Sequence, residues 1–161
     1  MIYLRLADDS DLPLIMAWRN LPAVKEGLYT QGNAEPHDLT WEEHLSWWKS
    51  RPSSWREFMV MFSRDATEDF MTRPVGVVTI GQCEYWEAET GILIGETSLW
   101  GRGVGRRALT IALDYLITKD FKFTRATILD SNKRSIRLYE SLGFRRIASA
   151  RPGESLYRKE L

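Results

Sequence analysis

A glycine-rich turn, Trp100-Gly-Arg-Gly-Val-Gly-Arg-Arg107, lies between an apolar stretch at Gly91–Gly95 and an apolar-periodic segment at Ala108–Ile117. These flanking patterns predict that the turn leads from a strand into a helix. Three glycines without side chains allow backbone N–H groups to approach a phosphate, and the dipole of the following helix favours an anion. The turn therefore predicts a diphosphate-binding site, although glycines also cap helices and turn chains.

Two familiar phosphate-binding loops fit this turn poorly. No Gly-Lys-Ser/Thr follows it, as a P-loop requires, and its glycines at 101, 103 and 105 lack the last glycine of the dinucleotide fingerprint. The preceding strand also comes late in the chain, whereas the dinucleotide fingerprint follows the first strand of its βαβ unit. The sequence therefore disfavours both folds.

A second segment, Asp130–Phe144, has the signals of a short helix at both ends. Ser131 or Asn132 can cap its amino end, and Gly143 suits the left-handed position after its carboxyl end. The apolar side chains inside the segment recur every three residues and predict one buried face, formed by Ile136, Tyr139 and Leu142. Considered alone, this segment is an amphipathic helix with a core tyrosine.

In order and spacing, the two segments together resemble the coenzyme motifs of the GNAT superfamily of acyl-CoA-dependent N-acyltransferases. The second motif corresponds to Asn132, Ser135, Leu138, Tyr139, Gly143 and Phe144. Trp100 stands where the family usually has Gln or Arg. This Trp-Gly-Arg-Gly form is similar to the branch of ribosomal-protein N-terminal acetyltransferases and some amino-sugar acetyltransferases.

The resemblance implies a mixed α/β (α+β) sheet of about seven strands, splayed at its centre and flanked by about four helices. The chain pattern predicts strands at Ile2–Leu6, Glu57–Ser63, Val75–Gly81, Glu87–Gly95, Thr124–Leu129, Arg145–Ala150 and Glu154–Lys159. Besides the two motif helices, it predicts helices at Asp8–Asn20 and from Thr40 through Trp48. Tyr29–Asp38 is expected to be a loop, and Arg64–Arg73 a charged hairpin.

The length and charge of the chain limit its possible functions. The 161 residues predict one domain, residues 1–161, with equal numbers of acidic and basic side chains. Zero net charge gives no field to attract nucleic acid or an anionic membrane. Cys83 is the only cysteine and is expected to be a small, at least half-buried residue. Because Met1–Ala7 alternates like a strand and no apolar run reaches membrane length, we expect a cytoplasmic protein. No metal is implied.

The resemblance implies that acetyl-CoA is the cosubstrate and that its pantetheine arm enters the gap between the fourth and fifth strands. Splaying would leave backbone groups of the fourth strand for pantetheine, and we expect these from Leu93, Ile94 and Gly95. Asn132 is expected near the pantetheine or the adenine. The diphosphate is expected to contact the turn and first helical residues, Arg102, Gly103, Val104, Gly105, Arg106 and Arg107.

Acetyl transfer needs a neutral amine, an oxyanion stabiliser and an acid for the departing thiolate. Tyr139, at the family's tyrosine position, is the expected acid. Glu89 is the first candidate base, with Glu84 and Glu87 behind it, although each can equally be a solvated strand-edge charge. An α-amine with a pKa of roughly 7.7 to 8.0 needs only water as base.

Acceptor selection is expected in the first two helices and their loop, where Trp18, Arg19 and Asn20 are candidate substrate-binding residues. The cluster of Trp41, Trp47 and Trp48 suits stacking on sugar rings or nucleobases. The alternative, which helical spacing favours, is that Trp41, Leu45 and Trp48 pack on the sheet. Arg51 can meet an acceptor anion or be solvated, and His37 and His44 are expected to be structural or exposed.

These observations favour transfer of acetyl from acetyl-CoA to a primary amine by direct attack in a ternary complex. The acceptor is either a protein amino terminus or an amino sugar. A longer acyl-CoA is the nearest alternative among enzymes, and a non-catalytic coenzyme-A-binding sensor or interaction module is the alternative from another class. The family also makes a homodimer plausible.

Overall fold

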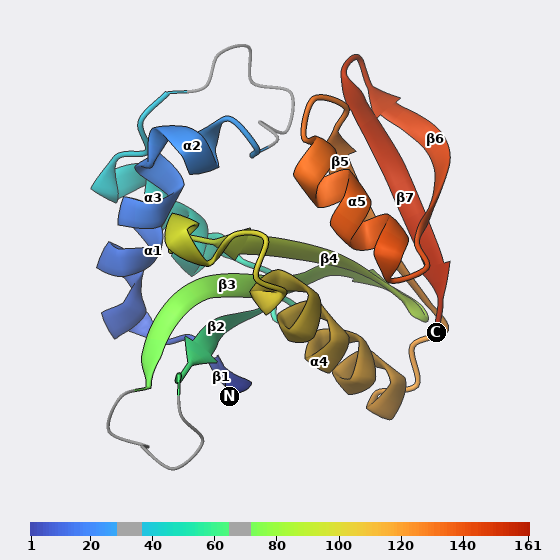
Figure 1. The fold of residues 1–161 in the computed structure, drawn as a ribbon, viewed down its shortest axis with the longest axis horizontal. Helices are drawn as coiled ribbons and strands as arrows, with labels where there is room; N and C mark the ends of the chain where they lie inside the picture. The colour runs from blue at the N-terminus through green and yellow to red at the C-terminus, as the bar shows by residue number, and fades with distance from the viewer. Residues whose placement is uncertain (29–36, 65–71) are drawn as a thin grey trace.

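The computed structural model describes residues 1–28, 37–64 and 72–161 and contains one seven-stranded sheet, in the order β1-β2-β3-β4-β5-β7-β6 (Figure 1). The strands are β1 (Ile2–Leu6), β2 (Arg56–Phe62), β3 (Arg73–Glu84), β4 (Glu87–Ile94), β5 (Phe123–Leu129), β6 (Arg145–Arg151) and β7 (Glu154–Glu160). The α-helices in these ranges are α1 (Leu12–Asn20), α2 (Pro22–Lys25), α3 (Trp41–Ser50), α4 (Val104–Thr118) and α5 (Lys133–Ser141). The predicted fold class is confirmed.

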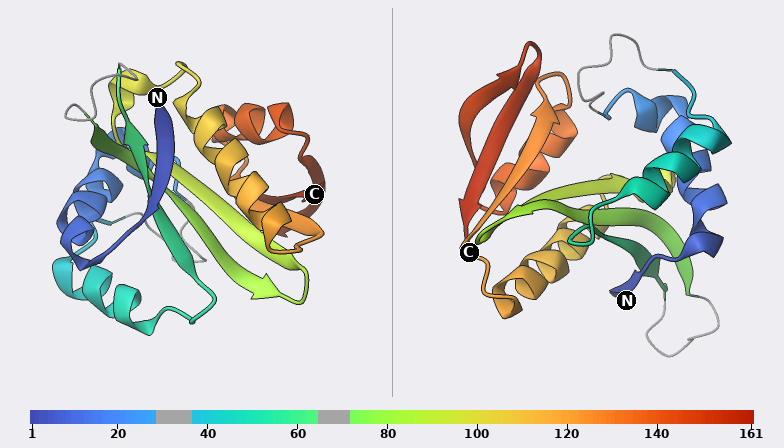
Figure 2. Two further views of the ribbon diagram at one scale, coloured as in Figure 1. Left: turned by 90° about the horizontal axis from the view of Figure 1, so that it is seen from below. Right: turned by 180° about the vertical axis from the view of Figure 1, so that it is seen from behind.

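Helices cover both faces of the sheet, with α1 and α3 on one face and α4 and α5 on the other (Figure 2). The larger core joins α4 to the sheet through small and branched side chains, including Ala108, Leu109 and Val78. A smaller core on the α1 face contains Ile15, Trp18 and methionines of β2. In the described ranges, no helix has the length and apolar content needed to cross a membrane.

The sheet is splayed between β4 and β5, which is its only parallel pairing among the described strands. Only Glu87–Glu89 of β4 pairs with β5, opposite Phe123–Arg125. Beyond these residues the strands diverge (Figure 1), while β4 stays paired with β3 as far as Ile94. Helix α5 follows β5, and its Tyr139 hydroxyl donates a hydrogen bond of 3.1 Å to the Thr90 carbonyl of β4. The expected opening is therefore present.

The ends of α5 are formed as the sequence predicts. Asn132 is the capping residue, and its side-chain oxygen accepts from the Ser135 amide at 3.0 Å. Gly143 has φ 89°, the left-handed conformation that lets the chain leave the helix without a Cβ penalty. Phe144 then packs edge-on against Tyr139, with 4.9 Å between ring centroids. Local side-chain chemistry thus fixes where this helix begins and ends.

The structure differs from the predicted elements in two boundaries and one additional helix. Helix α1 begins at Leu12 because Asp8 accepts from the Ser10 amide and directs Asp9–Asp11 into a separate 3-10 turn. The one-turn helix α2 was not predicted, and β3 extends to Arg73–Glu84. Most of the predicted loop and of the charged hairpin, residues 29–36 and 65–71, lies outside the described residues.

Gly95, at the end of β4, lies directly against the buried Trp18 ring. A Cβ at this position would be 2.0 Å from Trp18 Cγ. We expect Gly95→Ala to lower the free energy of unfolding by about 1–3 kcal/mol, because backbone or core must shift. Chemical denaturation measures this change, with Ser98→Ala in the exposed turn beyond as the control. Equal stability of the two variants would contradict the close packing of β4 on α1.

Candidate active site

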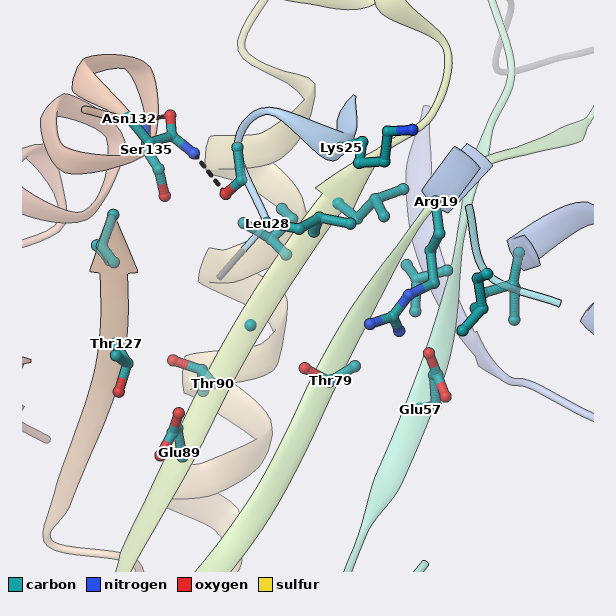
Figure 3. A pocket seen from close by; sticks show the side chains of 18 of the residues that line it. Arg19, Lys25, Leu28, Glu57, Thr79, Glu89, Thr90, Thr127, Asn132 and Ser135 are labelled. Carbon is teal, nitrogen blue, oxygen red and sulfur yellow. Dashed lines mark hydrogen bonds between the residues drawn. The ribbon is translucent and has the colours of Figure 1, made fainter. Parts of the chain in front are cut away.

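A cavity of about 390 Å³ lies on the α1 and α3 face of the sheet and extends to the β4–β5 opening. Its walls come from α1, α2, α3, the middle strands and α5, which lie far apart in the sequence (Figure 3). Its polar lining includes Arg19, Asn20, Lys25, His37, His44, Glu57, Thr79, Glu89, Thr90, Thr127, Asn132, Ser135 and Tyr139. Both charge signs therefore occur within one cavity.

Strand register aligns the cavity floor in a row across three strands. Glu57 of β2 lies opposite Thr79 of β3, and Thr79 lies opposite Gly91 of β4. A Cβ on Gly91 would be 2.5 Å from Thr79 Oγ1. Glycine, which has no side chain, therefore leaves room above this part of the cavity floor. Glu89, two residues before Gly91, projects from the same face of β4. The row thus links Glu57 to the opening beside β4.

The phase of the β3–β4 ladder determines which backbone groups of β4 face the opening. The Gly95 amide donates to the Val75 carbonyl at 2.9 Å, so it points toward β3. Because antiparallel pairs alternate, Leu93 also points toward β3, whereas Ile92 and Ile94 point toward the opening. The Ile94 carbonyl there accepts from Trp100 Nε1 at 2.8 Å. The Ile92 groups and the Ile94 amide therefore replace Leu93 and Gly95 as backbone that a ligand in the opening can reach.

The backbone conformation of the predicted diphosphate turn requires glycine at two positions. Gly101 and Gly103 have φ of 73° and 80°, and Gly103 is the residue before α4. Among the described residues, no side chain caps this end of α4, so its first N–H groups point outward. Gly105 lies inside the helix, where a Cβ would be 3.3 Å from Leu138 of α5. The three arginines of the turn and first helical residues, at 102, 106 and 107, are exposed.

Trp100 and Asn132 join parts of the chain around the opening. The guanidinium of Arg134, on α5, lies 3.6 Å from the centre of the Trp100 ring. The Asn132 side-chain amide donates to the Gly27 carbonyl at 3.0 Å, as the dashed line in Figure 3 shows. Its oxygen caps α5, so both ends of the Asn132 side chain bind protein groups. A contact between Asn132 and the coenzyme stays a prediction.

Tyr139 and Glu89, the predicted acid and base, both line the cavity. Tyr139 is 2% exposed, and Glu89 Oε2 lies 3.4 Å from Arg125 Nε. Burial raises the pKa of Glu89, while Arg125 and Thr127 act in the opposite direction. The other two candidates are outside the lining: Glu84 is exposed, and Glu87 accepts from Arg158 at 2.7 Å. Glu89 is thus the carboxylate of this group with access to the cavity.

Glu57 is a buried cavity residue that sequence reasoning placed only at the start of a strand. It is 2% exposed and lies 3.7 Å from Arg51 Nη1, and Arg19 extends toward it from α1 (Figure 3). Burial raises the pKa of Glu57 to about 7, against the opposing effect of Arg19 and Arg51. A carboxylate beside the apolar run Phe58–Phe62 was the available signal.

Helix α3 packs only in part as predicted, since Trp48 packs against the smaller core. Trp41, expected against the sheet, is 40% exposed, whereas the buried residue of this helix is His44. The inward face is centred on His44 and continues to Trp47, whose ring stacks on His44 at 5.8 Å between centroids. Burial lowers the pKa of His44, and the nearby Arg19 and Arg51 lower it further. His44 is therefore a neutral side chain at neutral pH.

The three predicted acceptor residues of α1 have different environments. Trp18 is 4% exposed and belongs to the smaller core, where it packs under Gly95. Arg19 and Asn20 line the cavity. The Asn20 side chain also exchanges two hydrogen bonds with the Leu39 backbone, at 2.7 and 2.9 Å. Within the described residues, no group of three or more His, Cys, Asp or Glu side chains is arranged to hold a metal ion.

The comparisons with known proteins agree with this architecture. A family model described as "Acetyltransferase (GNAT) domain" matches residues 2–145. An uncharacterized protein of Methanocaldococcus jannaschii is 39% identical over 160 residues, which are 99% of this chain and 31% of the relative. The chain therefore spans less than a third of the length of that curated relative.

Two solved structures have the same fold. The crystal structure of a domain from Methanocaldococcus jannaschii DSM 2661 has a TM-score of 0.90 and 38% identity, covering 100% of this chain and 99% of that chain. The spermidine N-acetyltransferase of Vibrio cholerae, in complex with CoA and spermine, has a TM-score of 0.78 and 20% identity. The match covers 99% of this chain and 94% of that one. At this identity the second likeness shows the fold alone.

The raised pKa of Glu57 predicts a pH-dependent stability difference. Between pH 4.5, the ordinary value, and about 7, folded Glu57 keeps a proton that the unfolded chain releases, so its contribution to stability falls as pH rises. Glu57→Gln stays neutral. We expect the variant to gain up to roughly 3 kcal/mol over wild type at pH 8, and nothing at pH 4. Urea denaturation at pH 4, 6 and 8 measures the difference.

Glu160→Gln, the same exchange at an exposed position of β7, is the control for this measurement. It should leave the difference from wild type close to zero at each pH. Parallel stability profiles for wild type and Glu57→Gln would show that Glu57 titrates normally in the folded protein.

Proposed function

Because the chain belongs to the GNAT acetyltransferase family, we propose that it transfers acetyl from acetyl-CoA to a primary amine by direct attack in a ternary complex. One observation carries the proposal: a single cavity joins Glu89, Tyr139 and the β4–β5 opening to the acceptor side formed by α1 and α3. An amine in this cavity and a thioester in the opening would meet beside Thr90.

The coenzyme half of the proposal rests on the opening and the turn before α4. The outward N–H groups of α4 favour the diphosphate, and the exposed Arg102, Arg106 and Arg107 add positive charge. Pantetheine amides can pair with the Ile92 backbone groups and the Ile94 amide. The Vibrio cholerae enzyme was solved with CoA, which supports the same cosubstrate for this chain. Acetyl is proposed over a longer acyl group.

The reaction requires a proton to leave the amine and another to reach the sulfur. The amine nitrogen bonds to the acetyl carbon, the carbon–sulfur bond breaks, and the thiolate takes a proton from the Tyr139 hydroxyl. In the present geometry this hydroxyl donates to Thr90, 3.1 Å away, so it must turn toward the sulfur. When the acceptor binds as an ammonium, Glu89 accepts its first proton; the second proton leaves the nitrogen after attack and returns through water to the Tyr139 phenolate. The raised pKa of Glu89 makes it a better proton acceptor than an ordinary carboxylate.

A protein amino terminus and an amino sugar remain the acceptor alternatives, and the cavity favours a small molecule. Its volume of about 390 Å³ falls in the usual range of roughly 300–1,000 Å³ for small-molecule sites. The spermidine acetyltransferase relative also acts on a small amine. Trp47 and Trp55 line the cavity with aromatic surface suited to a sugar ring.

Tyr139→Phe tests the acid. We expect kcat to fall by roughly 10²–10⁴, because the thiolate loses its proton donor, while acetyl-CoA affinity stays nearly unchanged. Thiol release measures turnover, and calorimetry measures binding. Unchanged turnover would remove Tyr139 from the mechanism. A loss of acetyl-CoA affinity as large as the loss of kcat would instead indicate a structural role for its bond to Thr90.

Glu89→Gln tests the base. We expect kcat/KM for an alkyl amine to fall by roughly 10²-fold at pH 7, and the deficit to shrink as pH approaches the pKa of the amine, because neutral amine becomes abundant. Glu84→Gln is the matched control, since Glu84 lies at the end of the neighbouring β3, is exposed and lies outside the cavity. A pH-independent deficit, or an equal deficit in the control, would contradict the assignment.

A panel of amino sugars, free amino acids, polyamines and peptides, assayed for thiol release from acetyl-CoA, tests the function itself. Turnover with one class establishes catalysis and identifies the acceptor class. Tight acetyl-CoA binding without turnover on any acceptor would favour the coenzyme-A-binding sensor instead.

A further inference from the structure

The α3 end of the cavity contains buried polar atoms that the surrounding protein does not satisfy. Glu57 Oε2 has no hydrogen bond from any described residue, although Glu57 is 2% exposed and lines the cavity. It lies 3.7 Å from Arg51 Nη1, beyond hydrogen-bond length. The indole N–H of Trp55, another lining residue, also lacks a described partner. Both ring nitrogens of His44, which also lines the cavity, lack a described partner as well. Donor and acceptor atoms are thus left unsatisfied along this end of the cavity.

Such atoms are costly unless water or a ligand completes them, because buried polar groups in proteins are almost always hydrogen-bonded, and a ligand that enters the cavity must replace that water. The missing complement is a group that donates to Glu57 and can accept from Trp55. A hydroxyl group can both donate and accept, so hydroxyl groups of an acceptor substrate can fill either role. An ammonium group donates only, and it would enter a region that already holds the guanidinium groups of Arg19 and Arg51 around Glu57.

The geometry points to Glu57 as a specificity-determining residue that binds a hydroxyl group of the acceptor, so that the preferred substrates are hydroxylated primary amines. This inference rests on the proposed function, since it identifies the substrate class of the same cavity. Glu57 acts by holding the acceptor and takes no part in the proton transfers assigned to Tyr139 and Glu89.

The register also sets how far the hydroxyl lies from the reacting amine. Glu57 and Gly91 are two strands apart across Thr79, which is about 10 Å at the usual strand spacing. Figure 3 shows Glu57 and Glu89 at separate positions along the cavity floor. The amine and the recognised hydroxyl must therefore lie on opposite sides of the acceptor, as they can across a hexose ring.

The test compares acceptors that differ in hydroxyl groups. The probes are aminodeoxyhexoses with the amine at carbon 2, 3, 4 or 6, 4-aminotetrahydropyran as the ring without hydroxyls, and spermidine. We expect wild type to prefer at least one aminohexose. Glu57→Met should lower kcat/KM for that aminohexose by roughly 10- to 100-fold, the value of a hydrogen bond to a charged group, and leave 4-aminotetrahydropyran and the KM for acetyl-CoA unchanged.

Two further variants separate recognition from folding. Glu57→Gln keeps the length and hydrogen-bonding capacity of the side chain, so it should restore part of the selectivity that Glu57→Met loses. Glu160→Met, the same exchange at an exposed position of β7, should match wild type. A wild type that prefers spermidine or 4-aminotetrahydropyran would overturn the inference. So would a Glu57→Met variant that loses activity equally on all acceptors.

Absence of turnover in wild type would refute the proposed function, and binding would then decide the inference. Calorimetry of the same amines against the protein saturated with acetyl-CoA supplies this readout. Binding of an aminohexose that weakens at least 10-fold in Glu57→Met would uphold recognition of a hydroxyl by Glu57. Absence of aminohexose binding to wild type would overturn it.

Discussion

The separation of β4 from β5 after three residue pairs is the constraint on which the site depends. A continued ladder would consume the outward backbone groups of β4 and close the route between the two faces of the sheet. Because the strands part, α5 can pack beside the opening and bring Tyr139 to the Thr90 carbonyl. The same separation lets the cavity on the α1 and α3 face reach residues of α5. The fold and the site therefore both depend on the separation of β4 from β5.

The two faces of the sheet have different roles, one in stability and the other in the candidate site. The α4 face packs small and branched side chains into the larger core, and that core supplies most of the apolar burial. The opposite face buries carboxylates of Glu57 and Glu89, and burial raises the pKa of both. Such groups lower stability, so the α4 core must offset them. Their concentration in one cavity is the pattern expected where a protein binds and transforms a ligand.

Much of the fold was predictable because its signals are local. The caps and apolar period of α5, the turn before α4 and the order of elements along the chain came from neighbouring residues, and the splayed mixed sheet came from the resemblance that the motif spacing carries. Glu57 and His44 were missed as cavity residues because their environment depends on how α1 and α3 pack on β2, which no local pattern encodes. The β4 backbone groups that face the opening differ from those expected for a related reason. Backbone groups of a strand point alternately to its two sides, which is known without a structure. Which residues of β4 point toward the opening depends on the pairing of β4 with β3.

Trp100 departs from the family motif, yet its indole N–H and its ring both have partners in the structure. Its indole donates to the Ile94 carbonyl, the last outward acceptor of β4, and its ring supports the Arg134 guanidinium of α5. The tryptophan therefore links both sides of the opening, and it leaves a cation of α5 near the turn before α4. Because the Ile94 carbonyl already accepts from the indole, a ligand that extends β4 pairs with the Ile94 amide and with the Ile92 groups further in. This pairing places the reacting end of such a ligand toward Thr90, where Tyr139 lies.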